Sequence, residues 1–183
     1  GDGAIGIQAM NSTLDFTNSI IKLNIGTQAN ETNSTGNKSG NDPNYVEDAT
    51  GIVAQTTGSI TLDDYNIQLG SHAKSSMGFV VQGGGVTLNN NSKNNSIISD
   101  GGISNILLVA AGASSNLTIG ANTVLSALNG SNQMGIFANS GAVVNNSSDL
   151  SVTGAGSLGY IINNGASITN TGTSTVTGGV YTD

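Results

Sequence analysis

The chain has 183 residues, enough for one domain with a core, and its composition is 36% hydrophobic, 8% charged and rich in glycine, with 27 copies. The formal net charge is −7 and arginine is absent, which excludes nucleic-acid binding, because a cationic surface is needed to contact phosphates. Electrostatic attachment to an anionic membrane is disfavoured for the same reason.

Neither cysteine nor a long apolar run occurs in the sequence. The absence of cysteine fits a protein that lives outside a bacterial cell, and it fits equally a chain that never needed thiols. No stretch approaches the roughly 20 apolar residues of a membrane-spanning helix, so we do not expect the chain to be embedded in a membrane. β-branched residues and Gly/Asn/Ser clusters recur at short intervals instead, which predicts strands and turns throughout.

Six imperfect copies of one unit follow each other along the chain, and each begins with a short apolar run. After a longer first unit the period stays in the twenties, and this drifting length is typical of a solenoid with variable loops. The units begin near Ile5, Thr50, Met77, Asn105, Met134 and Leu158, and a seventh begins at Gly178. We expect them to form a single segment over residues 1–183.

The first unit contains an insertion at about residues 26–49. This segment holds the only proline, Pro43, and several charged residues, so we expect it to leave the solenoid as a polar loop at a corner. Loops often carry binding residues, and Asp42, Tyr45 and Glu47 are the candidate contact residues here. The alternative is a polar excursion without a function.

Each later unit reads as three short strands separated by turns. A second strand such as Ile60-Thr61-Leu62 follows a glycine corner, and a third strand such as Leu150-Ser151-Val152 alternates strictly. Three strands per turn predict an all-β parallel β-helix of about six turns, stacked ~4.8 Å apart. The corner glycines, which would tolerate a positive φ, are Gly58, Gly85, Gly112, Gly141 and Gly165.

The first strands separate inward from outward positions. If Ile52 and Ala54 point into the core, then Val53 points outward, and apolar residues occupy the same place in the following units. Exposed apolar area usually marks a surface that something covers. Here the cover could be the insertion, another protein or a second subunit. The alternative is that the register is shifted by one residue, so that these side chains point inward. The outward positions are Val53, Val80, Leu108, Phe137 and Ile161, of which Val80, Phe137 and Ile161 are candidate partner-binding residues.

Residues that could carry catalysis or bind a metal are few and scattered. Asp63 and Asp64 are adjacent and would point to opposite faces of a strand, whereas glycoside hydrolysis needs two carboxyl groups that face one sugar. His72 is the only histidine and no calcium-loop spacing occurs, so we expect no catalytic residue, no metal site and no cofactor. Recurring asparagines, as at Asn145-Asn146 and Asn170, predict amide ladders along the rod.

The unit GI-x-A-x-x-G-[AS]-x-[VI]-x-N, as it stands at Gly51 to Leu62, Gly135 to Asn146 and Gly159 to Asn170, resembles the repeats in passenger domains of type V monomeric autotransporters. The Asn-rich, arginine-free composition is similar to that of fusobacterial surface adhesins. The resemblance covers nearly the whole chain. It implies a slice of a longer right-handed β-helix that is exported through the outer membrane to the bacterial cell surface, and it supplies no catalytic residues.

These features predict an extracellular adhesin segment that acts as a rigid spacer and binding surface. The expected partner is a receptor or glycan on a host cell or on another bacterium, and self-association of the rod is a further possibility. A β-helical enzyme that acts on polysaccharide is one alternative function, and a self-associating structural rod is the other.

Overall fold

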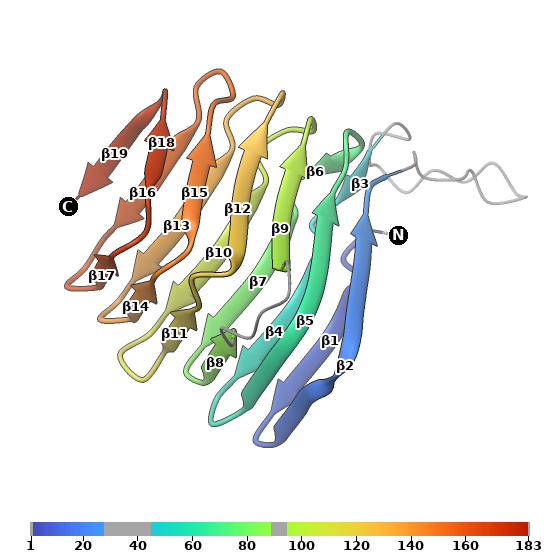
Figure 1. Ribbon diagram of the computed structural model, residues 1–183, viewed down its shortest axis with the longest axis vertical. Coiled ribbons are helices and arrows are strands. Elements are labelled where there is room, and N and C mark those ends of the chain that lie inside the picture. Colours follow the sequence, from blue (N-terminus) through green and yellow to red (C-terminus); the bar gives the residue numbers. More distant parts are fainter. Residues whose placement is uncertain (1, 28–44, 89–94, 183) are drawn as a thin grey trace, which may run out of the picture.

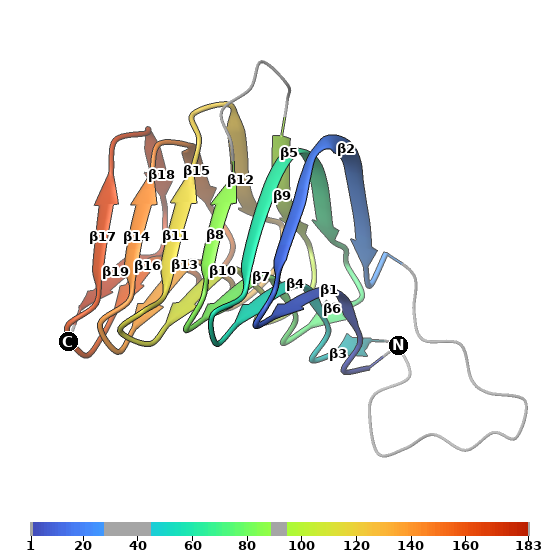
Figure 2. The same cartoon turned by 90° about the horizontal axis from the view of Figure 1, so that it is seen from below.

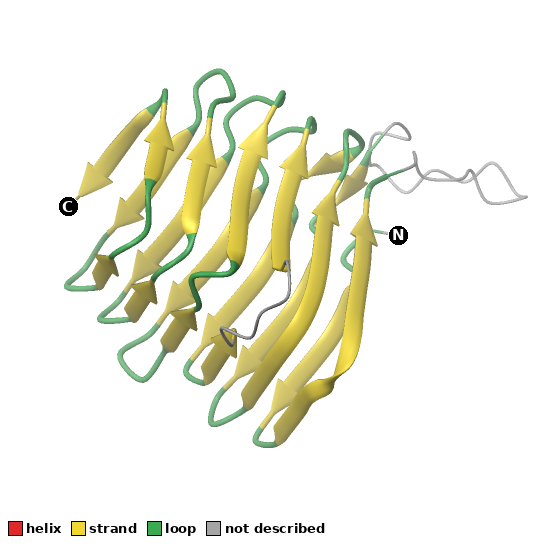
Figure 3. Cartoon of the chain, in the orientation of Figure 1, coloured by secondary structure: helices red, strands yellow, loops and turns green. Residues whose placement is uncertain are grey.

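The computed structural model describes residues 2–27, 45–88 and 95–182, and every regular element in these ranges is a β-strand (Figure 3). The chain winds as a parallel β-solenoid, with successive turns stacked side by side along one axis (Figures 1 and 2). The expected all-β parallel β-helix is therefore confirmed. The candidate Asp42, and most of the insertion with it, lies outside the described residues.

One strand of each turn joins a seven-stranded sheet, in which all neighbouring strands are parallel. The order of the strands follows the chain, so each turn lies between the turn before it and the turn after it (Figure 1). The strands are β1 (Ile5–Met10), β4 (Thr50–Gln55), β7 (Met77–Gln82), β10 (Ile106–Ala111), β13 (Met134–Asn139), β16 (Leu158–Ile162) and β19 (Gly179–Thr182).

A ten-stranded parallel sheet closes the other side of the core, and a two-stranded sheet lies apart from it (Figure 2). In order, the ten-stranded sheet contains β17 (Ser167–Asn170), β14 (Val143–Asn146), β11 (Asn116–Ile119), β8 (Gly85–Leu88), β5 (Ser59–Leu69), β9 (Asn95–Asp100), β12 (Thr123–Leu128), β15 (Asp149–Val152) and β18 (Ser174–Val176), while β2 (Thr13–Ile25) pairs with β5. The small sheet consists of β3 (Val46–Glu47) and β6 (Ala73–Lys74).

Within the described residues, the four turns that begin with β7, β10, β13 and β16 each place one strand in the seven-stranded sheet and two separate strands in the ten-stranded sheet. In the two turns before them the second and third strands run on as one long strand, β2 or β5, so the expectation of about six three-strand turns is corrected to four. β5 pairs with β8 through its first part and with β9 through its last part. Its sequence, SITLDDYNIQL, has no glycine or proline to break it, and Asp63-Asp64 therefore lie within a strand.

The inward positions of the seven-stranded sheet form the predicted ladder, in which Ile52, Phe79 and Ile136 are fully buried. The fourth turn differs, because Ile106 rather than Asn105 opens it and pairs with Met77. Leu108, expected to point outward, is consequently buried in the core, and Val109 takes the outward place.

Residues with positive φ mark the corners of the turns. Gly112, Gly141 and Gly165 have φ values of 102°, 78° and 71°, as expected. In the third turn Gly83, with φ 83°, takes this place, whereas the expected Gly85 opens β8. A second corner repeats the left-handed conformation in successive turns, at Asp48, Ser75, Ser104, Asn132 and Gly156.

Amide side chains hydrogen-bond along the stacking direction, which confirms the predicted ladder between Asn146 and Asn170. Asn146 Nδ2 donates to Asn170 Oδ1 over 2.6 Å. A second ladder was not foreseen: Gln8 Nε2 donates to Gln55 Oε1 over 2.7 Å, and Gln55 Nε2 donates to Gln82 Oε1 over 3.2 Å. These bonds add to the backbone ladder that holds each turn to the next.

Candidate binding surfaces

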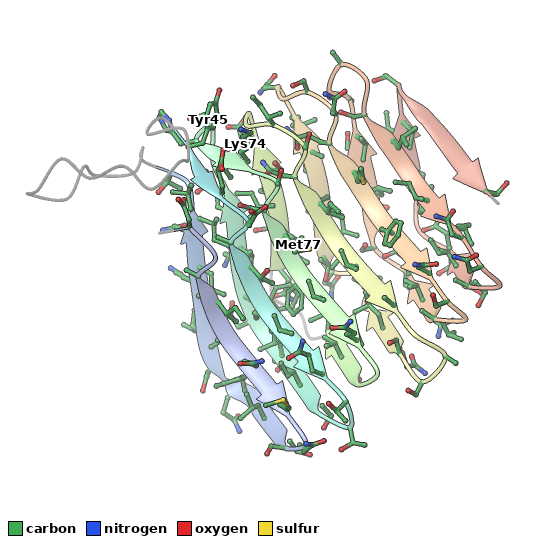
Figure 4. All side chains as sticks on the ribbon, turned by 180° about the vertical axis from the view of Figure 1, so that it is seen from behind. Tyr45, Lys74 and Met77 are labelled. Atoms are coloured by element: carbon green, nitrogen blue, oxygen red, sulfur yellow. The ribbon has the colours of Figure 1, made fainter. Side chains whose placement is uncertain are left out.

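Two of the predicted contact residues lie at the small β3–β6 sheet: Glu47 belongs to β3, and Tyr45 precedes it, close to Lys74 (Figure 4). Lys74 Nζ lies 2.7 Å from Glu47 Oε1 and 5.8 Å from the centroid of the Tyr45 ring. A partly exposed ion pair of this kind stabilises a fold by about 0–1 kcal/mol. Tyr45 and Glu47 thus both contact Lys74 within the chain, next to the pairing of β3 with β6.

Val80, Phe137 and Ile161, the other predicted contact residues, lie in one column on the outer side of the seven-stranded sheet. The column runs in register across five strands as Val53, Val80, Val109, Phe137 and Ile161. None of these side chains belongs to the buried core cluster, which is formed by their sequence neighbours. The outward direction predicted for the three candidates is consistent with this register.

A second apolar column, not foreseen from the sequence, lies on the same side and contains Met77, Ile106, Met134 and Leu158. It exists because two successive residues point inward at the start of each strand. Phe79 is buried in the core, and a Cβ placed on Gly78 would lie 2.8 Å from Ile97 Cγ2 of the opposite sheet. The residue before this pair, Met77 in β7, is therefore on the outer side (Figure 4). We call the two columns together the apolar face.

No described segment lies across the apolar face (Figures 2 and 4). Val53, Val109 and Ile161 are nonetheless only 4%, 8% and 6% exposed, because side chains on the adjacent strands flank them on both sides. Met77, Ile106, Met134, Leu158, Val80 and Phe137 are partly exposed. The face is thus a closely spaced set of apolar ridges.

The outer side of the ten-stranded sheet differs in character, because polar side chains predominate and the described residues form at least three shallow grooves there. We call the part formed by β2, β5, β9, β12, β15 and β18, with the corner that follows β5 and β9, the grooved face. The first groove, about 380 Å³, contains Thr27, Gln68, Gly70, Ser71, Asp100, Gly101 and Asn129. The second, about 270 Å³, contains Lys22, Asn24, Asn66, Ile67, Gln68, Ser96 and Ile98. The third, about 220 Å³, contains Val124, Leu125, Asp149, Leu150, Ser151, Thr173 and Thr175.

Carboxylates are spread over the surface and are not paired in these grooves. Asp100 lines the first groove and Asp149 the third, while Asp63 is buried and Asp64 is partly buried on β5. Within the described ranges, no three His, Cys, Asp or Glu side chains lie close enough together to hold a metal ion. The chemistry that these grooves offer is hydrogen bonding by amides and hydroxyls.

Comparison with protein-family models, with curated proteins and with solved structures found no match. Among the described residues there is no helix that could span a membrane.

Two features of these faces have a signal in the sequence that could have located them. Met77, Ile106, Met134 and Leu158 each stand immediately before the inward-pointing residue pair of their strand, so a long apolar residue recurs at the start of each of these four units. The grooved face corresponds to the polar places of the alternating third strands, such as Gln68. The depth of the grooves has no such signal, because it depends on side chains from neighbouring turns.

Proposed function

We propose that the chain is a segment of a bacterial cell-surface adhesin, in which the solenoid is a rigid spacer and the grooved face binds a receptor or glycan. The observation that carries the proposal is the series of grooves along one polar face of the rod. Stiffness follows from the fold, because each inner turn is hydrogen-bonded to a turn on either side. Such a rod is suited to hold a binding surface away from a cell.

The chemistry of the first two grooves favours a partner rich in hydroxyl and amide groups. Asn24 and Gln68 expose amide side chains, each of which offers both donors and acceptors, and Gln68 lines both grooves. Among the described residues that line them, Lys22 and Asp100 are the only charged ones. A neutral sugar chain or an uncharged polar protein loop fits this lining better than a highly charged ligand.

Location outside the cell, as the passenger of an autotransporter, is part of the proposal. It is supported by the resemblance of the repeats, by the absence of cysteine and by an Asn-rich composition with few charged residues that folds through repetition. In this proposal the chain binds and does not catalyse. The scattered carboxylates of the described surface are in accord with that, since no two of them line one groove.

Adhesion of coated beads tests the binding half of the proposal. Beads that carry the chain should attach to epithelial cells or to bacteria more than uncoated beads do, and the double variant Asn24→Ala, Gln68→Ala should reduce attachment at least fivefold. The matched control removes two exposed amides from the other sheet, by Gln8→Ala and Gln82→Ala, and should leave attachment unchanged. Attachment at the level of uncoated beads, or equal loss in both double variants, would refute the role of the grooved face.

A glycan panel separates binding from catalysis. The chain should retain neutral glycans without releasing new reducing ends or unsaturated products from neutral or acidic polysaccharides. Measurable turnover that survives repurification would overturn the proposal in favour of an enzyme.

A further inference from the structure

We propose that the apolar face is an interface between two copies of this chain, which pack with their seven-stranded sheets toward each other. The inference goes beyond binding of a surface ligand, because it uses the opposite side of the solenoid from the grooved face.

Composition gives the first step. The nine side chains of the apolar face are aliphatic, methionine or aromatic: eight of them run without a polar interruption from β7 to β16, and Val53 continues one column into β4. Burial of such groups stabilises a contact by about 25 cal/mol per Å² of apolar area removed from water. The methionines, Met77 and Met134, have flexible side chains that can adapt to an opposing surface.

Charge indicates which partner fits the face. The chain carries a formal charge of −7, so two copies repel each other at most orientations. The described outward positions of β1, β4, β7, β10, β13 and β16 contain no charged residue, whereas Lys22, Asp100 and Asp149 lie on the grooved face. Contact through the apolar face keeps the carboxylates of both copies at a distance. A charged partner would gain no ion pair there.

The period of the face favours a second copy over an unrelated surface. Its ridges recur at the spacing of parallel strands, about 4.8 Å, and the same spacing is present on every other copy of this chain. Two such faces can therefore repeat one favourable contact at each turn, and sheets packed in this way lie about 10 Å apart, as in β-sandwiches. Uncharged amides at the ends of the strands, such as Gln55 and Gln82, provide a polar rim.

The size of the face sets the strength of the contact. Five strands cover about 20–25 Å along the rod, and two columns give a width of about 15 Å, which amounts to an outline of several hundred Å² per copy. Val53, Val109 and Ile161 are already 4–8% exposed, so the accessible apolar area within this outline comes mainly from the other six side chains. A stable interface needs about 800 Å² per partner. We therefore expect a weak dimer, with a Kd on the order of 0.1 mM, that becomes effective where many copies are held close together.

Sedimentation equilibrium between about 10 µM and 1 mM tests the proposal. The wild type should show a monomer–dimer equilibrium that does not weaken at high salt, because the contact is apolar and salt screens the net charge. The variant Val80→Ser, Phe137→Ser should weaken dimerisation at least tenfold. The matched control Val124→Ser, Val143→Ser makes the same kind of change at two exposed positions on the other sheet and should leave the dimer unchanged.

Cross-linking provides a second measurement that does not rely on disruptive variants. Because the chain has no cysteine, Met134→Cys introduces a single thiol on the apolar face and Val124→Cys introduces one on the grooved face. Met134→Cys should form an intermolecular disulfide at least tenfold faster. A chain that stays monomeric at 1 mM, a dimer that is equally sensitive to both serine pairs, or equal cross-linking rates would each overturn the proposal.

Discussion

Tyr65 shows how one side chain connects three turns of the solenoid. It is fully buried in β5, and its ring meets Phe79 edge to face, with centroids 6.2 Å apart. Its hydroxyl lies 2.5 Å from Thr123 Oγ1, and its backbone N–H donates to Asn95 Oδ1 over 3.1 Å. The sequence does not reveal this role, because Asp63-Asp64-Tyr65-Asn66 reads as a polar stretch and the partners come from other turns.

Replacing Tyr65 by Phe should destabilise the fold by about 1–2 kcal/mol, because the Thr123 hydroxyl would be left buried without its partner. The double variant Tyr65→Phe, Thr123→Val removes both polar groups and should recover most of that loss. Denaturant unfolding of the three proteins measures both values. A double variant less stable than Tyr65→Phe would show that the hydrogen bond is not the cause.

The same residue predicts a loss of stability in alkali. Burial raises the pKa of the Tyr65 phenol well above its ordinary value, while the hydrogen bond with Thr123 acts in the opposite direction and is weaker. The folded state therefore keeps a proton that the unfolded state releases above about pH 10. The contribution of the Tyr65 phenol to the free energy of unfolding should be constant below about pH 10 and should fall as the pH rises above that value. The advantage of wild type over Tyr65→Phe should shrink in that range, and a constant difference up to pH 11 would contradict the assignment.

Asn146 ties a turn together in a similar way. Its side chain is 1% exposed, accepts hydrogen bonds from the Ser148 backbone N–H over 3.2 Å and from Ser148 Oγ over 2.5 Å, and donates to Asn170. Asn146→Ala should cost about 2–3 kcal/mol, because buried groups of Ser148 would lose their acceptor. The neighbouring Asn145 is exposed, and Asn145→Ala should change stability by less than about 0.5 kcal/mol. Thermal unfolding of the pair measures the difference, and equal effects would refute the ladder as the source.

At the scale of the strand, the recurring glycine of the seven-stranded sheet is required by space and not by a positive φ. A Cβ on Gly78 would lie 2.6 Å from the Leu107 carbonyl oxygen, in addition to its contact with Ile97. Gly78→Ala should therefore cost about 1–3 kcal/mol through overpacking. At Gly85, the first residue of β8, an added Cβ would have space, because the nearest atom is Asn116 O at 3.9 Å. Gly85→Ala should therefore be neutral or slightly stabilising. Chemical denaturation of both variants checks this contrast, and it fails if Gly85→Ala is the more harmful change.

The strands also show where reading the sequence succeeds and where it fails. Alignment of the repeated units located the inward ladder in most turns, because Ile52, Phe79 and Ile136 stand at the same place in their units. It failed in β10, where Leu107, Leu108 and Val109 are all apolar, so that a register shifted by one residue gives the same pattern of apolar side chains. It also missed the second apolar column, since strict alternation does not allow two successive inward residues.

At the scale of the whole molecule, repetition made the fold predictable and left the function open. A repeat period and glycine corners suffice to predict a solenoid, because each turn must place its strands beside those of the next. A binding surface depends instead on which side chains of different turns share a groove or a face. Gln68 and Asn24 illustrate this, because they come from different turns and meet only once β5 and β2 are paired.

The ends of the described solenoid should open before its middle. Each turn is stabilised mainly by its neighbours, and the end strands β1 and β17 have a partner on one side only. Their inward residues Ile7 and Ile168 are partly exposed, while Phe79 in β7 is fully buried. Amide hydrogen exchange should therefore be slowest in β7, β10 and β13, and at least a hundredfold faster in β1 and β17, as mass spectrometry of peptides can measure. If all strands exchange at one common rate, the rod opens as a single unit, and its stiffness cannot be described as a sum of contacts between neighbouring turns.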